Sequence, residues 1–103
     1  MKRISIAVLA AVLGISLAAG AAEADRRERR QQERIAEGVE SGQLTPRETA
    51  RLERKEARVQ REIQRDRAAN GGTLTPAERR RINRQQNRLS RQIHREKHDA
   101  QHN

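Results

Sequence analysis

One eight-residue phrase occurs twice in the chain and divides it into similar units. Residues 41–48 read SGQLTPRE, and residues 71–78 read GGTLTPAE, thirty positions later. When residues 41–70 are aligned with residues 71–100 at this offset, apolar and arginine positions downstream of the phrase also coincide. The sequence therefore predicts two copies of a unit of about 30 residues, with the phrase at each junction.

Each phrase has the residue pattern of a helix start. In T-P-x-E, the threonine is an N-cap, the proline takes the first helical position, and the glutamate completes a capping box. The threonine hydroxyl accepts a free backbone N–H, and the glutamate accepts the N–H of the cap residue. The glycine upstream suits the left-handed conformation that ends a preceding helix. We therefore expect a helix–helix corner at each phrase, capped by Thr45 with Glu48 and by Thr75 with Glu78.

These corners predict an all-α fold with three amphipathic helices after a signal peptide. The first helix is expected from Asp25 to about Glu40, and the second from Pro46 to about Ala69, where an Asn-Gly-Gly sequence stops it. The third is expected from Pro76 to about Lys97. The second and third helices carry matching apolar positions on one face, which is typical of helices that pack on a common core.

Residues 1–22 have the composition of a secretory signal peptide. Two basic residues precede an uncharged, mostly apolar run, and small residues follow it at the cleavage spacing. The alternative is a membrane anchor, for which the apolar run is short. The chain contains no cysteine, which excludes disulfides, a thiolate metal site and a lipid-modified N-terminal cysteine. We expect export, to the periplasm, of a small helical domain formed by residues 23–103.

The segment after the leader has few large apolar side chains for a domain of its length. The chain has no Phe, Trp or Tyr, so only aliphatic side chains can form a core. This favours marginally stable helical hairpins, an oligomer, or folding on a partner, and it does not suit an enzyme with a dry, rigid pocket. The large aliphatic residues after the leader are Ile35, Val39, Leu44, Leu52, Val59, Ile63, Leu74, Ile82, Leu89 and Ile93.

Arginine is arranged in two matching ladders, one on each of the long predicted helices. Each ladder falls on the helix face opposite the apolar stripe. Residues 46–67 hold eight basic and five acidic residues, whereas residues 76–97 hold eight basic and two acidic ones, so the third helix is the more cationic. The first ladder is Arg51, Arg54, Arg58, Arg61 and Arg65, and the second, our candidate anion-binding surface, is Arg81, Arg84, Arg88, Arg91 and Arg95.

The charge excess favours an anionic partner. The chain has 23 basic and 14 acidic residues, and arginine pairs bidentately with carboxylate and phosphate. Acidic protein segments and anionic envelope lipids are the expected partners, while nucleic acid lies in the wrong compartment and would lack aromatic stacking platforms. The alternative is that arginine merely solvates the helix surface. We expect no cofactor and no catalytic site, because no nucleophile lies beside a base. The predicted function is therefore non-enzymatic binding, either chaperone-like or as an envelope-associated structural protein.

The phrase resembles the second half of an EF-hand loop. In that resemblance Gly42 and Gly72 make the sharp turn, and Glu48 and Glu78 close the calcium site. The first half of each loop departs from the pattern, since Arg67 stands at a ligand position of the second copy. The resemblance implies a degenerate EF-hand-like scaffold, or a metal-responsive protein, without a full set of calcium ligands.

The phrase also resembles the repeated LTxxQ motif of small, basic periplasmic chaperones. Here the motif reads LTPRE and LTPAE, with Glu48 and Glu78 at the glutamine position. That resemblance implies a helical dimer with a cationic cradle for unfolding clients. The whole chain is most similar to short exported bacterial proteins with paired LTPxE phrases, a group that implies no activity.

Three histidines follow one another near the C-terminal end at intervals of four residues. On a continuous helix His94 and His98 would share a face and are weak candidates for a metal site, with His102 one turn further. The alternative is chance spacing on a solvated helix end, which we favour because helical histidines alone make an unselective site.

Overall fold

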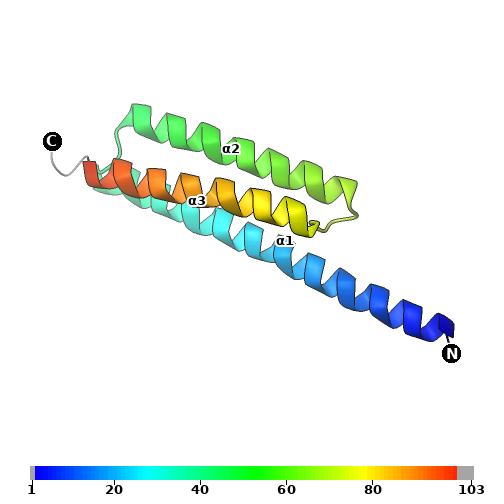
Figure 1. The fold of residues 1–103 in the computed structure, drawn as a ribbon. Helices are drawn as coiled ribbons and strands as arrows, with labels where there is room; N and C mark the ends of the chain where they lie inside the picture. Colours follow the sequence, from blue (N-terminus) through cyan, green and yellow to red (C-terminus); the bar gives the residue numbers. More distant parts are fainter. Residues whose placement is uncertain (1, 100–103) are drawn as a thin grey trace.

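The computed structural model describes the backbone of residues 2–99 and the side chains of residues 19–99. The described residues form three helices, α1 (Lys2–Ser41), α2 (Pro46–Ala69) and α3 (Pro76–Asp99), and no strand. Consecutive helices are antiparallel, so α1 and α3 run in the same direction, and each helix packs against the other two (Figure 1). The prediction of an all-helical chain with three helices is confirmed.

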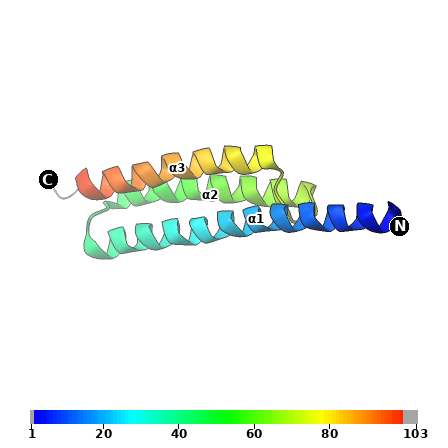
Figure 2. The same cartoon turned by 60° about the horizontal axis from the view of Figure 1, so that its bottom comes forward.

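The first helix is longer than predicted. It begins at Lys2 rather than near Asp25, and it runs without a break through the expected signal peptide. The physical reason is that no proline separates the Ala- and Leu-rich run from the charged segment. The N-terminal part of α1 projects beyond the other two helices (Figure 2). Within the described part of the chain, no helix meets the length and hydropathy of a membrane span. Removal of residues 1–22 stays a prediction.

Both corners contain the hydrogen bonds of a capping box. The Thr45 N–H donates to Glu48 Oε1 (2.9 Å), and the Glu48 N–H donates to Thr45 Oγ1 (3.1 Å). The second corner repeats the pair, with 2.9 Å from Thr75 N to Glu78 Oε1 and 3.2 Å from Glu78 N to Thr75 Oγ1. The Thr75 N–H also lowers the pKa of the Glu78 carboxyl. The glycines before the caps have positive φ, at Gly42 (75°), Gly71 (64°) and Gly72 (94°), as the turns require.

Removing the caps tests whether the corners stabilise the fold. We expect Thr45→Ala and Thr75→Ala each to lower the free energy of unfolding by about 1 kcal/mol, because each leaves a helix-end N–H without its side-chain acceptor. Urea unfolding followed by circular dichroism measures the change. Thr49→Ala is the control, because its hydroxyl donates to the Thr45 carbonyl and does not cap an N–H. Equal losses in all three variants would show that the caps have no special role.

The interior consists of two apolar clusters separated by polar side chains. One cluster joins Ala21 and Ala24 of α1 to Val59, Ile63, Leu74 and Ile82, and the other joins Ile35, Leu44, Leu52, Leu89 and Ile93. All the large aliphatic residues after the leader except Val39 are therefore buried within one chain. The small number of large apolar side chains led us to expect marginally stable helical hairpins, an oligomer, or folding on a partner. In the structure these side chains pack among the three helices of one chain, with small alanines of α1 and polar side chains filling the rest of the interior. Marginal stability, self-association and folding on a partner stay predictions.

Val39 does not join the core, although it is one of the large aliphatic residues that were expected to form it. Its side chain is 50% exposed, whereas its neighbour Gly38 is buried. Leu44 folds back over this glycine, and its N–H donates to the Gly38 carbonyl (3.0 Å). A Cβ at Gly38 would lie 2.5 Å from Leu44 Cδ1, which is closer than packed carbon atoms approach. The missing side chain therefore makes room for the corner residue, and Val39, one residue further round the helix, faces solvent.

Candidate anion-binding groove

A cationic groove runs between α2 and α3. Its volume is about 540 Å³, and five of its lining side chains are basic while none is acidic. The buried residues Val59 and Leu89 form its floor. The lining residues are Lys55, Arg58, Val59, Gln85, Arg88, Leu89, Arg91, Gln92 and Arg95.

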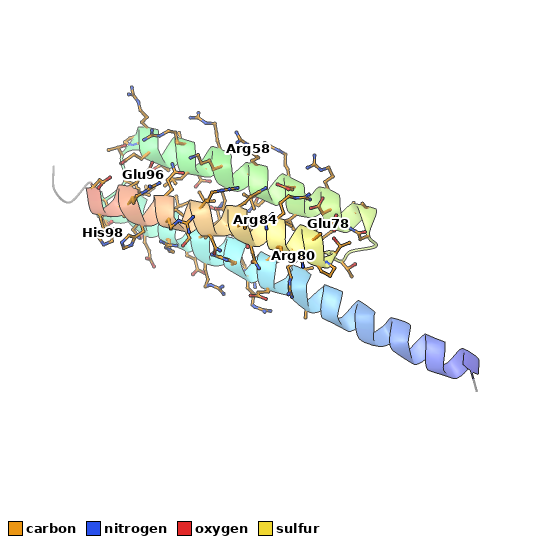
Figure 3. All side chains as sticks on the ribbon, in the orientation of Figure 1. Arg58, Glu78, Arg80, Arg84, Glu96 and His98 are labelled. Carbon is orange, nitrogen blue, oxygen red and sulfur yellow. The ribbon has the colours of Figure 1, made fainter. Side chains whose placement is uncertain are left out.

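The internal repeat explains why the two walls match. Val59 and Leu89 occupy equivalent positions, thirty residues apart, and so do Arg58 and Arg88, which precede them. Because α2 and α3 are antiparallel neighbours, the equivalent arginines approach the same seam from opposite helices (Figure 3, where Arg58 is labelled). Arg88, Arg91 and Arg95 are three and four residues apart, which places them in one row along α3.

Several carboxylates of these two helices form ion pairs outside the groove. Arg81 pairs with Glu62 (2.8 Å) and Asp66 (3.0 Å) of α2, and the Asp66 hydrogen bond raises the pKa of Arg81. Glu96 pairs with Arg51 (3.6 Å). Among the described residues, no carboxylate lies within 4.0 Å of the guanidinium groups that line the groove. These groups belong to Arg58, Arg88, Arg91 and Arg95.

The predicted ladder on α3 is therefore split. Arg88, Arg91 and Arg95 line the groove, whereas Arg81 joins α3 to α2 through its ion pairs. Arg84 is exposed and does not line the groove (Figure 3). Arg58 was not among the predicted anion-binding residues, because the five acidic residues of α2 made its arginine ladder the less cationic one. The equivalence of Arg58 and Arg88 in the repeat is the signal that could have found it.

The other side of α2 has a different charge. A hollow between α1 and α2 is lined by Asp25, Glu28 and Glu33, with Arg29 as its one basic side chain. Asp25 also pairs with Arg67 of α2 (2.5 Å). Among charged side chains, the α1–α2 hollow is therefore lined mostly by carboxylates and the α2–α3 groove by cations alone. An anionic ligand is expected to prefer the groove.

His94 and His98 lie next to each other near the end of α3. The rings of His94 and His98 are tilted by 35° with centroids 3.8 Å apart, and His98 Nδ1 lies 2.8 Å from the His94 carbonyl oxygen. No group of three or more His, Asp or Glu side chains suited to a metal occurs among the described residues, and His102 lies outside them. Glu48 and Glu78, the closing residues of the EF-hand resemblance, hold helix caps instead.

A buried polar layer, which the sequence analysis did not identify, separates the two apolar clusters. It consists of Glu28 and Gln31 of α1, Glu56 of α2 and Gln86 of α3, all almost fully buried. Gln86 Nε2 donates to Glu28 Oε1 (2.9 Å), and Gln31 Nε2 donates to the Gln86 carbonyl (2.8 Å). Burial, together with the neighbouring Glu28 carboxyl, raises the pKa of Glu56 to about 9. The Glu56 carboxyl is therefore protonated at neutral pH.

Comparison with protein-family models, with curated proteins and with solved structures found no match to this chain. The function must therefore be argued from the groove and the charges around it.

Proposed function

We propose that this protein is a small, exported, non-enzymatic binding protein whose α2–α3 groove holds acidic segments of partner proteins. The observation that carries the proposal is the lining of the groove, in which five basic side chains occur without an acidic one. Binding of exposed acidic segments would give a chaperone-like activity, in keeping with the predicted resemblance to small periplasmic chaperones.

The form of the groove suits an extended polypeptide. It follows the seam between two long helices, so that a chain can lie along it and meet Arg88, Arg91 and Arg95 in succession. Guanidinium groups pair bidentately with carboxylates, and the amides of Gln85 and Gln92 can exchange hydrogen bonds with a peptide backbone. The groove offers a polyanion charge pairing and hydrogen bonding, but no aromatic surface for a nucleobase.

An anionic lipid surface is the less favoured partner. Insertion into a bilayer interface requires exposed apolar side chains. Val39 is the one large apolar residue exposed among the described side chains, and it lies on α1, away from the groove lining. Binding to lipid would therefore be electrostatic only, and salt would release it.

A pair of matched double variants tests the groove. Arg58→Gln with Arg88→Gln removes one guanidinium from each wall, and we expect it to weaken binding of a fluorescent Asp/Glu-rich peptide about tenfold in 50 mM salt. Arg54→Gln with Arg84→Gln is the control, since it removes the same charge one turn away, at equivalent repeat positions outside the groove. Fluorescence anisotropy measures the affinity.

The control is expected to change the affinity by less than about threefold, through the general field of the protein alone. Circular dichroism should show equal helicity in both variants, because glutamine is nearly as good a helix former as arginine. Equal weakening in the two variants would show that only net charge matters and would refute the groove. Unchanged binding in both would mean that the arginines only solvate the surface.

A further inference from the structure

A second hollow lies between α1 and α3, on the other side of the α3 arginine row. Its volume is about 450 Å³, and the groove shares two of its lining residues. Every lining side chain can donate a hydrogen bond, and none is a carboxylate. The lining residues are Arg34, Ser90, Arg91, His94 and Arg95.

The guanidinium of Arg34 is held in place across the two helices. Its Nη1 donates to Ser90 Oγ (2.7 Å), and its Nη2 donates to the Ser90 carbonyl (3.2 Å). A guanidinium has five N–H donors in a fixed plane, so three remain for a ligand. The side chain is therefore oriented before any ligand arrives, which lowers the entropic cost of binding.

The surroundings of this hollow add positive charge. Lys97 Nζ donates to the Arg34 carbonyl (3.1 Å), and the nearest acidic partner of Lys97 is Glu37, 4.0 Å away with a side chain 72% exposed. Among the described residues, Arg34, Arg91 and Arg95 have no carboxylate within 4.0 Å. Three arginines from two helices thus line one hollow, and none of them has a carboxylate partner among the described residues.

We propose that this hollow binds a phosphate group. One arginine suffices for a carboxylate, whereas three guanidiniums arriving from α1 and α3 match the several oxygens and the higher charge of a tetrahedral phosphate. The Ser90 hydroxyl, already an acceptor from Arg34, can turn its own proton toward a phosphate oxygen. The phosphate can be free, part of a soluble phosphomonoester, or the head group of a lipid.

The hollow and the groove compete for two side chains. Arg91 and Arg95 line both, so a phosphate in the hollow should draw these guanidiniums toward α1 and weaken peptide binding in the groove. This coupling rests on the proposed function, whereas phosphate binding itself does not, because Arg34 and Ser90 line only the hollow.

Arg34→Gln tests the proposal in the full chain. Isothermal titration with inorganic phosphate and with glycerol phosphate should show saturable binding by the parent, about tenfold weaker in the variant. Arg34→Lys should recover little, because an ammonium keeps the charge but lacks the planar fork. The control, Arg30→Gln, removes an exposed arginine one turn earlier on α1 and should bind like the parent. Circular dichroism verifies that each variant is folded.

The two sources of phosphate are separated by sedimentation with vesicles that contain phosphatidic acid. Arg34-dependent binding to both vesicles and soluble phosphate assigns the site to a lipid head group, and binding to soluble phosphate alone assigns it to a small ligand. No saturable binding by the parent, or equal affinity in the parent and Arg34→Gln, would overturn the proposal. A parent protein that binds phosphate but not the acidic peptide would refute the proposed function of the groove without affecting the phosphate site.

Discussion

Raising the pH from 6 to 8.5 is expected to lower the free energy of unfolding by about 3 kcal/mol, and Glu56→Gln to remove most of this dependence. Glu56 is fully buried, and its carboxyl faces Glu28 of α1, which accepts a hydrogen bond from Gln86 of α3, with Glu53 nearby on its own helix. Among the described residues, no cation pairs with this carboxyl.

The loss of stability with rising pH follows from the raised pKa of Glu56. Glu56 has a pKa of about 9 in the folded protein, against an ordinary value of 4.5, so the folded state holds a proton that the unfolded state releases. Stability from this group is complete below about pH 4.5 and is lost as the pH rises through 9. Each pH unit within that window removes up to about 1.4 kcal/mol.

Urea unfolding at pH 6, 7 and 8.5, followed by circular dichroism, measures the effect. Glutamine at position 56 can donate to Glu28 without a titratable proton, so Glu56→Gln should be the more stable protein at pH 8.5. Glu40→Gln makes the same substitution at an exposed position near the end of α1 and should retain the pH dependence of the parent. If the stability of the parent depends on pH as little as that of Glu56→Gln, then water or a rearrangement stabilises the ionised Glu56 carboxylate beside Glu28.

Truncating Ile35 is expected to be far more damaging than truncating Val39, although the two lie one turn apart on α1. Ile35 is 1% exposed and packs with Leu44, Leu52, Leu89 and Ile93, so Ile35→Ala should cost about 2–5 kcal/mol through lost burial and a cavity. Val39→Ala should change stability by less than about 0.5 kcal/mol, because Val39 is half exposed.

Thermal and urea unfolding compare the two variants with the parent. In a fold with so few apolar side chains, loss of the helical signal in Ile35→Ala at room temperature would agree with the expected cost. Similar losses in both variants would mean that Val39 is covered in solution, as self-association would require. Sedimentation of the parent protein across concentrations would then identify the covering copy.

The capping residues and the glycines were readable in the sequence because a capping box acts within four residues. Thr45 and Glu48, or Thr75 and Glu78, make the same hydrogen bonds whatever the rest of the chain does. The ends of α2 and the start of α3 followed from these signals and from the Asn-Gly-Gly stop. The same local chemistry determined that the fold is helical.

Only the tertiary structure decided which side chains of different helices meet. Periodicity placed Arg81 and Arg88 on one polar face, but the packing of α3 on α2 engages Arg81 with Glu62 and Asp66 and leaves Arg88 beside Arg58. Helical periodicity is too coarse to show that Gly38 rather than Val39 faces the core. That choice depends on the position of the Leu44 side chain, which packs over Gly38. The meeting of Glu28 with Glu56 likewise depends on the register of two helices, which residues far apart in the sequence set together.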